Sequence, residues 1–389
     1  MPIQKDDGKP GLLATGKLGD ASSQIPMYLQ VANVDDSGLL SALFRDYTFW
    51  ASAYLLEPCH LNLLAKGEYG LGREYLPKNI AIPLNIIAQK LGAKPFMEYA
   101  QSYAYLIFPA TQVIDCTIGG RRTSRKELIH VAMVAHTPKL VSSTLVTLEG
   151  AEGKDRKVFN TGLKGVLSAM KAINLEMDTM WTRSDPNDYK EFRTFIMGIK
   201  SQPMFPNGVV YEGVSEKPVS YRGESGANDS IIPTIDNLLQ VYQRMPNNPL
   251  TEILKDFRAY RPLPHTQWLE MVQCRAQKAD LRAFAMGDDE SAVLYLENLD
   301  QNREFRQRHW NFAKEYIIKH TEHPVATGGS PILTWLPNQL STVLTIMDET
   351  ASQIKAKSPL LDKTLGRMLN QKNILNREVQ KLQQKFATK

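Results

Sequence analysis

The stretch that decides how this chain folds and works is Glu304-Phe-Arg-Gln-Arg-His-Trp-Asn-Phe-Ala-Lys-Glu-Tyr-Ile-Ile318. Apolar residues recur in it at spacings of three and four, which predicts one amphipathic helix with a single inward face. A histidine stands within that face, which is made of Phe305, His309, Phe312, Ala313, Tyr316 and Ile317. Because a buried imidazole has two ring nitrogens to satisfy, this histidine needs a polar neighbour or a metal ion.

Two interpretations of His309 remain open on the helix alone. In the first, it is a core histidine that hydrogen bonds to another residue. In the second, it binds the iron of a haem. Arg306 lies three residues earlier on the same side of the helix, where it would place a cation beside the haem propionates.

Length and composition narrow the class of protein. The chain has 389 residues, 43% of them hydrophobic, and its 46 basic and 41 acidic residues give a net charge of +5. The N-terminus lacks the apolar core of a signal peptide, and there is no long uncharged apolar run, so we expect a cytoplasmic protein. Without a basic stripe interleaved with aromatic residues, neither nucleic acid nor a membrane is an expected partner.

The cysteines argue against two kinds of site. The chain has only three of them, Cys59, Cys116 and Cys274, and no CxxC spacing. An odd number without paired spacing predicts neither a disulfide framework nor a thiolate metal cluster. We interpret them as reduced structural thiols.

Helical periodicity recurs along most of the chain and strand signals are few, which predicts an all-α fold. We expect a flexible leader over residues 1–24, a small and mainly helical N-terminal domain over 25–118, and a large helical domain over 119–364. The glycine-bearing polar stretch 119–125 is the predicted boundary. Within the small domain, the helix that begins at Ser37 is expected to end near Pro58.

The last segment, residues 365–389, is basic and has a helical pattern of apolar residues. It is interpreted either as a short coiled-coil arm or as a solvated helix that packs back on the body. A further loop, Tyr221-Arg-Gly-Glu-Ser-Gly-Ala-Asn-Asp-Ser230, precedes a predicted helix and favours an anionic group at its backbone amides. His130 and His136 lie in an apolar segment and are predicted to be structural.

Three blocks of the chain resemble the indoleamine 2,3-dioxygenase family. They occur in the family's order and together cover most of residues 30–345. The blocks are Leu76-Pro-Lys-Asn-Ile-Ala-Ile-Pro with Tyr99-Ala-Gln-Ser-Tyr103, then Gly208-Val-Val-Tyr-Glu-Gly213 with Arg222-Gly-Glu-Ser-Gly-Ala-Asn-Asp-Ser230, and finally Arg306 and His309 with Ala326-Thr-Gly-Gly-Ser-Pro331.

The resemblance implies a haem b enzyme whose large helical domain is roofed by a smaller one. It implies His309 as the iron ligand, Arg306 facing a propionate, and Asp236 tuning the histidine. Arg193 would bind the substrate carboxylate through its two-pronged guanidinium. Thr327 would lie in a mobile loop that closes over the substrate, hinged at two glycines.

The same resemblance implies a set of pocket residues. Small residues that let the indole approach the haem edge are Ser225, Gly226 and Ala227. Residues expected to line the distal pocket are Tyr99, Ser102, Tyr103, Leu128 and Ile129. The chain departs from the family where a distal serine becomes Ala132 and where aromatic positions become Leu128 and either Asp188 or Tyr189. No residue is expected to act as a protein acid or base, because the cofactor carries the difficult step.

The resemblance therefore predicts an enzyme that cleaves the C2–C3 bond of the L-tryptophan indole with O2 and forms N-formylkynurenine. Two alternatives stay open. One is a haem enzyme that oxidises or rearranges a different indole in secondary metabolism. The other is a non-catalytic haem-binding helical protein whose basic C-terminal helix binds a partner. We expect a monomer or a weak oligomer.

Overall fold

A computed structural model describes residues 9–100, 129–184, 186, 189, 193–245, 249–320, 325–355 and 359–387. Helices dominate it, which confirms the all-α prediction; the only strands among these residues form a two-stranded parallel sheet. The predicted boundary at 119–125 and residues Ser102, Tyr103, Leu128 and Asp188 lie outside the described ranges. No helix in the described ranges combines the length and apolarity needed to cross a membrane.

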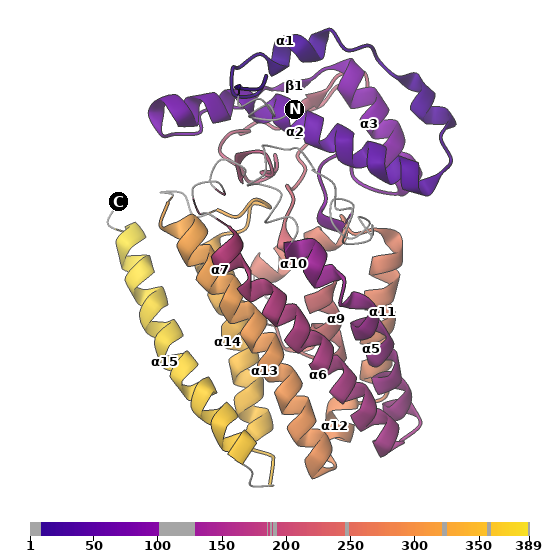
Figure 1. The fold of residues 1–389 in the computed structure, drawn as a ribbon, viewed down its shortest axis with the longest axis vertical. Coiled ribbons are helices and arrows are strands. Elements are labelled where there is room, and N and C mark those ends of the chain that lie inside the picture. Colours follow the sequence, from indigo (N-terminus) through magenta and orange to yellow (C-terminus); the bar gives the residue numbers. More distant parts are fainter. Residues whose placement is uncertain are drawn as a thin grey trace.

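The elements form two units, one above the other in Figure 1. The N-terminal unit contains α1 (Leu18–Ser23), η1 (Leu29–Asn33), α2 (Ser37–Lys66), β1 (Tyr75–Leu76), α3 (Lys78–Leu91) and β2 (Val210–Tyr211). The helical unit contains α5 (Thr137–Glu152), α6 (Arg156–Asp178), α7 (Met180–Arg183), η4 (Gly226–Asn228), α9 (Ile231–Leu238), η5 (Tyr242–Arg244), α10 (Pro249–Arg258), α11 (Leu263–Lys278), α12 (Leu281–Met286), α13 (Asp289–Phe312), η6 (Ala313–Ile318), α14 (Ile332–Ala351) and α15 (Pro359–Ala387).

The two units do not divide the chain at a single point. The core of the N-terminal unit combines residues 13–97 with residues 195–211, which come much later in the sequence. The parallel pairing of β1 with β2 joins these stretches, with Tyr75 opposite Val210 and Leu76 opposite Tyr211. A domain limit near residue 118 therefore omits a segment that packs in the small unit.

Residues 9–24 differ from the expected flexible leader. Their helix α1 packs on α2, with Leu18 buried and Trp50 donating a 2.8 Å hydrogen bond to the Ser22 hydroxyl. Both carboxylate oxygens of the buried Glu57 accept backbone N–H groups at the start of α1, from Leu18 at 2.7 Å and Gly19 at 3.1 Å. This long-range capping satisfies amide groups that a short helix cannot pair internally.

Helix α2 also differs from the prediction, because it continues through Pro58 to Lys66. A proline lacks the N–H that would bond to the carbonyl four residues earlier, here that of Tyr54. The guanidinium of Arg73 donates to this Tyr54 oxygen, and the Arg73 backbone N–H donates to the Leu55 oxygen at 2.9 Å. A side chain from a later loop thus replaces the missing helical bond.

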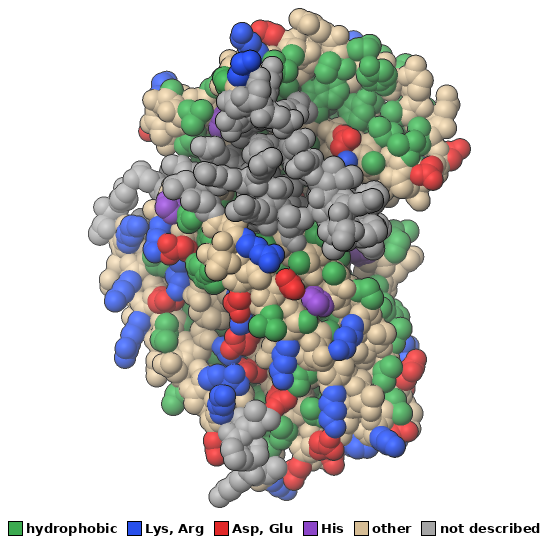
Figure 2. Space-filling model, in the orientation of Figure 1, with side chains coloured by type: hydrophobic (Ala, Val, Ile, Leu, Met, Phe, Trp, Pro, Cys, Tyr) green, Lys and Arg blue, Asp and Glu red, His purple; other side chains and the backbone are tan. Residues whose placement is uncertain are grey.

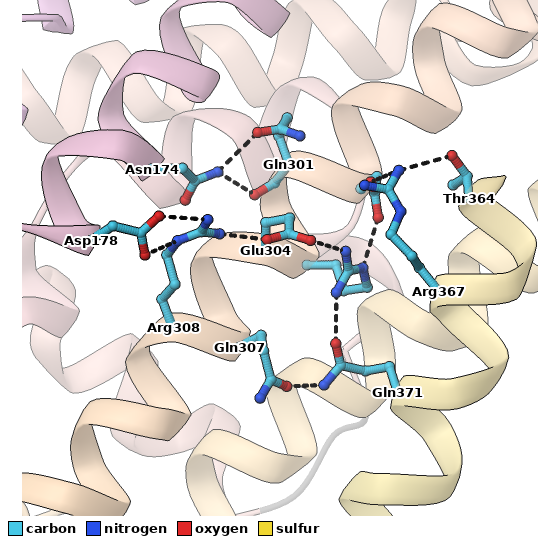
Figure 3. Close-up of polar contacts among 11 residues, drawn as sticks. Asn174, Asp178, Gln301, Glu304, Gln307, Arg308, Thr364, Arg367 and Gln371 are labelled. Atoms are coloured by element: carbon cyan, nitrogen blue, oxygen red, sulfur yellow. Dashed lines mark hydrogen bonds and ion pairs between the residues drawn. The ribbon is translucent and has the colours of Figure 1, made fainter. Parts of the chain in front are cut away.

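The C-terminal helix α15 packs back on the body, as one of the two interpretations predicts, and begins at Pro359. Figure 3 shows polar contacts that join it to α13, among them the hydrogen bond that Gln371 donates to Gln307. Arg303 of α13 also donates to Asp300 at 2.7 Å and to Gln371 of α15 at 2.6 Å. Further along, the indole N–H of Trp310 donates to Glu378 at 2.8 Å. These contacts join one face of α13 to α15. His309, next to Trp310 in the sequence, lies on another face of α13, which points into the helical unit.

The visible surface carries charges of both signs over the helical unit, interspersed rather than gathered into one patch (Figure 2). Apolar side chains are more frequent on the N-terminal unit, at the top of the view, where Tyr28, Leu29 and Leu39 are each about half exposed. The drawn face therefore offers no continuous basic stripe.

Candidate functional site

The predicted inward face of α13 and η6 lines a cavity. Every residue of the stripe contributes to its wall: Phe305, His309, Phe312, Ala313, Tyr316 and Ile317. The helix changes to π geometry from Ala313 to Ile318, just beyond the histidine. Such single π turns are frequent at functional sites, and this one adjusts the angle at which the last residues of the stripe meet the cavity.

The cavity is large and mostly apolar. Its volume is about 200 Å³, whereas one water molecule needs only about 10–15 Å³ on the same measure. The other described residues that line it are Tyr99, Ile129, His130, Met133, Met177, Met180, Tyr189, Ile196, Glu224, Ser225, Gly226, Asp229, Ala326, Thr327, Ser330, Ile332, Trp335 and Leu336. An apolar hollow with a few polar groups is the usual form of a cofactor or ligand site.

The His309 side chain is exposed to this cavity and also lines a smaller hollow beside it. It makes no hydrogen bond to any residue that the structure describes. Burial, with a smaller contribution from the nearby Arg306 charge, lowers the pKa of His309 to about 4. The ring is therefore neutral near pH 7, with a nitrogen lone pair available to a metal ion.

A buried ion pair lies one turn behind the histidine. Arg306 donates to Asp236 at 2.7 Å and also to the Asn302 side-chain oxygen, while the Asn302 amide donates to Asp236 at 2.9 Å. The Arg306 Nε–H is buried and has no partner among the described residues. Arg306 and His309 both line a second, smaller hollow of about 90 Å³. A ligand with an acidic group there would satisfy the remaining Arg306 donor.

These residues fit a haem. The described part of the chain holds no cluster of three or more His, Cys, Asp and Glu side chains suited to a metal. His309 would thus be a single protein ligand, which is what an iron already held by a macrocycle takes from a protein. The apolar wall suits a flat porphyrin, and the unpaired Arg306 Nε–H suits a propionate.

Comparison with known proteins identifies the family. Residues 50–358 match the family model described as indoleamine 2,3-dioxygenase. The chain belongs to the indoleamine 2,3-dioxygenase family.

Three similar proteins show how far known sequences differ from this chain. Indoleamine 2,3-dioxygenase 1 of Rattus norvegicus is 22% identical over 259 residues, which are 64% of this chain and 63% of the rat protein. Indoleamine 2,3-dioxygenase qulI of Penicillium citrinum is 24% identical over 84% of this chain and 78% of the fungal protein. A myoglobin of Haliotis diversicolor is 26% identical over 60% of each chain. The match thus spans slightly less than two thirds of the rat protein.

The structure brings several of the predicted family residues to one cavity. Tyr99, Ile129, Ser225, Gly226 and Thr327 all line it together with His309. Ala132, the position where the family's serine is replaced, is half-buried and is not among the described lining residues. Nothing is described of the Ala227 side chain, although its backbone lies in η4 between Gly226 and Asn228.

Arg193 lies behind the cavity wall. It is buried, its guanidinium donates to the backbone oxygen of Val325, and it also hydrogen bonds to the Tyr189 side chain. It is not among the described residues that line the cavity, whereas Tyr189 is. In this arrangement the Arg193 guanidinium is engaged by Val325 and Tyr189.

The loop over residues 325–331 is held against the cavity by several hydrogen bonds. The Thr327 hydroxyl donates to the backbone oxygen of Glu224 at 2.5 Å, and the Gly198 backbone N–H donates to the backbone oxygen of Thr327 at 3.0 Å. Arg222 donates to the Gly328 oxygen at 2.8 Å. The structure therefore shows this loop packed against the cavity, where Ala326, Thr327 and Ser330 form part of the wall.

The packed position of this loop requires a glycine at Gly329. Its φ is +84°, and a Cβ atom there would lie 2.6 Å from the Lys200 carbonyl oxygen. A side chain in left-handed backbone costs about 1–2 kcal/mol before any clash is counted. We expect Gly329→Ala to displace the loop, which would speed proteolysis within residues 325–331 and weaken substrate binding while haem stays bound.

Gly366→Ala is the matched control for the loop variant, because a Cβ at Gly366 on α15 meets no atom within 4 Å. It should leave both proteolysis and substrate binding unchanged. If the loop of Gly329→Ala resisted proteolysis as well as the wild-type loop does, the packed position of the loop would not need this glycine.

Sequence reasoning missed the polar groups of the opposite wall. His130, predicted to be structural, lines the cavity and shares a 2.9 Å hydrogen bond between its Nδ1 and the Tyr99 hydroxyl. The loop Tyr221–Ser230, predicted to favour an anionic ligand, instead carries two carboxylates of its own into the wall, Glu224 and Asp229. No periodic pattern marks such loop residues, so the sequence offered no signal for their direction.

Proposed function

We propose that this protein is a haem b-dependent dioxygenase that opens the indole ring of L-tryptophan, inserts both atoms of O2 across its C2–C3 bond and releases N-formylkynurenine. The observation that carries the proposal is His309, a neutral imidazole open to an apolar cavity without a hydrogen-bond partner among the described residues. Family membership and the similarity to a myoglobin support the haem, and the names of the two dioxygenase relatives support the reaction class.

The chain's own residues would hold the cofactor. His309 would bind the iron, and Arg306 would donate its remaining N–H to a propionate while Asp236 fixes the guanidinium by the 2.7 Å ion pair. Ser225 and Ala227 would lie near the haem edge, where small residues leave room for an indole. When bound, haem supplies the iron that activates O2.

The remaining residues would bind the substrate and exclude water. Gly226 and the apolar wall would accept the indole, and the closed loop with Thr327 would cover it. Tyr99 would contribute to the distal wall, and Ser102, Leu128 and Ala132 are proposed as further pocket residues from the family resemblance. Arg193 would bind the carboxylate after a movement of the loop at Val325. No protein acid or base is assigned a role.

The reaction is tested with isotopically labelled O2. The purified protein is supplied with L-tryptophan, a reductant and labelled O2, and the product is analysed by mass spectrometry. We expect a kynurenine-type product that carries two labelled oxygen atoms before deformylation. A product with one labelled atom or none would overturn the dioxygenase proposal, even if haem is bound.

A second candidate is the oxidation of an indole other than L-tryptophan by the same haem site. The position of Arg193 favours it, because the residue expected to receive the tryptophan carboxylate is bonded to Val325 and Tyr189 instead of lining the cavity. Turnover of L-tryptophan at a rate far above that of other indoles would argue against this candidate.

A further inference from the structure

Arg222 joins the loop over residues 325–331 to helix α10 from outside the cavity. Its side chain is only 5% exposed, and it is not among the described residues that line the cavity. The Arg222 Nη1 donates a 2.8 Å hydrogen bond to the backbone oxygen of Gly328, and the Nε donates one of 2.7 Å to the Asp256 carboxylate of α10. A single buried cation thus bridges a loop of the cavity wall and a neighbouring helix.

Asp256 fixes the direction of this guanidinium. The same Asp256 oxygen also accepts a hydrogen bond from the Lys200 ammonium group at 2.6 Å. Burial acts to raise the pKa of Asp256, but the hydrogen bonds and charges of Lys200 and Arg222 outweigh it and lower that pKa, so that the carboxylate is ionised near pH 7. The next residue on α10 is Phe257, whose ring centroid lies 5.0 Å from the Arg222 guanidinium carbon. A charge and an aromatic ring thus hold the guanidinium in place.

The middle of the loop depends on backbone hydrogen bonds. Gly328 and Gly329 have no side chains with which to pack, and glycine leaves the backbone more conformational freedom than any other residue. Gly328 lies so close to α10 that a Cβ atom there would stand 2.3 Å from the Phe257 ring. The bond from Arg222 is therefore made at the point where the loop meets that helix. The neighbouring loop residues that line the cavity are Ala326, Thr327 and Ser330.

We propose that Asp256 and Arg222 are positioning residues for the cavity wall: Arg222 holds the loop over residues 325–331 by the Gly328 oxygen, and Asp256 acts through Arg222. Neither residue has to touch a ligand. A loop that loses this attachment carries part of the wall away from a bound molecule, which shortens the time that the molecule stays bound. This consequence rests on the proposed haem-dependent function, whereas the attachment of the loop does not.

The attachment is tested by hydrogen–deuterium exchange of the full chain, followed by mass spectrometry before and after haem loading. One reporting amide is that of Gly329, which donates to the Ala326 oxygen at 2.8 Å. The other is that of Gly198, which donates to the Thr327 oxygen at 3.0 Å. In Asp256→Asn, which keeps the shape of the side chain and removes its charge, we expect both amides to exchange roughly tenfold faster, because a charge-assisted hydrogen bond is lost from a partly exposed ion pair. Exchange at the wild-type rate would overturn the proposal.

Three further variants show whether Asp256 acts through Arg222. Glu252→Gln is the matched control, because Glu252 is an exposed residue of the same helix and pairs with Lys255 within it; the exchange should stay as in the wild type. Asp256→Glu retains the charge and should recover part of the protection. Arg222→Leu, checked for folding by circular dichroism, should expose the two amides at least as much as Asp256→Asn does. Protected amides in a folded Arg222→Leu protein would contradict the proposed route.

The consequence for a ligand is measured on the haem-loaded protein with 3-methylindole, whose dissociation is followed by the Soret band. Asp256→Asn should release it roughly 3- to 10-fold faster while binding as much haem as the wild type does. Failure of this inference is distinguishable from failure of the proposed function. Faster amide exchange in a protein that takes up no haem would support the attachment and refute the proposed function. Wild-type exchange in Asp256→Asn, together with doubly labelled product from the wild type, would refute only the role of Asp256 and Arg222.

Discussion

The His309→Ala variant should lose the Soret absorption band that the haem-loaded wild type shows. The imidazole is the ligand that the structure offers to the iron, since it is open to the cavity, neutral near pH 7 and without a hydrogen-bond partner among the described residues. Removing it leaves a hollow lined by apolar groups, which can hold a porphyrin weakly by contact but cannot ligate its iron. The measurement is the absorption spectrum of each purified protein after reconstitution with haem.

His320→Ala is the matched control for this experiment. His320 lies just beyond η6 on the same run of helix and is exposed, so its removal should leave the Soret band in place. Circular dichroism checks that both variants remain helical. Haem binding that survives intact in a folded His309→Ala protein would remove the main support for the proposed function.

The helical stripe around His309 was predictable because it depends on local spacing. A helix places residues three and four apart on one face, and all members of the predicted stripe do face one space. Periodicity alone does not show whether such a face packs against other side chains or surrounds a cavity. That distinction needs the other walls, which come from α6, α14 and loops far away in the sequence.

The errors of sequence reasoning arise where distant residues replace a local interaction. Pro58 predicts a helix end because it has no N–H for the Tyr54 backbone oxygen. Arg73 from a later loop donates a hydrogen bond to that oxygen instead. Residues 9–24 look like a flexible leader, but Glu57 of α2 caps their helix. Neither partner is recognisable from spacing, because each lies more than ten residues away and acts through a side chain.

The polar wall of the site was unpredictable for a related reason. Asp229 belongs to a glycine-bearing loop, where neighbouring side chains have no fixed angular relation to one another. The loop before α9 was interpreted as a place for an external anion, yet the Asp229 carboxylate itself accepts the Ile231 N–H near the start of that helix. A carboxylate of the chain itself thus occupies a backbone N–H that sequence reasoning had left for an external anion.

Removing the Asp236 carboxylate should cause the largest loss of stability among the site residues. In Asp236→Ala the Arg306 guanidinium, only 5% exposed, would remain buried with Asn302 as its remaining partner. Breaking one side of a buried ion pair costs about 3–5 kcal/mol. We expect a decrease of that size in the free energy of unfolding, measured by urea denaturation of the haem-free protein. Glu290→Ala, which breaks an exposed pair with Lys164, should cost less than about 1 kcal/mol.

A double variant separates the structural role of this ion pair from its role toward the cofactor. Adding Arg306→Leu to Asp236→Leu removes both buried charges, and an apolar replacement of a buried pair is often neutral for stability. We therefore expect the double variant to recover most of the lost unfolding free energy. Its haem affinity should nevertheless fall, because the Arg306 Nε–H assigned to a propionate is gone. If the stable double variant bound haem as tightly as the wild type, Arg306 would be a structural residue only, and the propionates would have to be held by other groups.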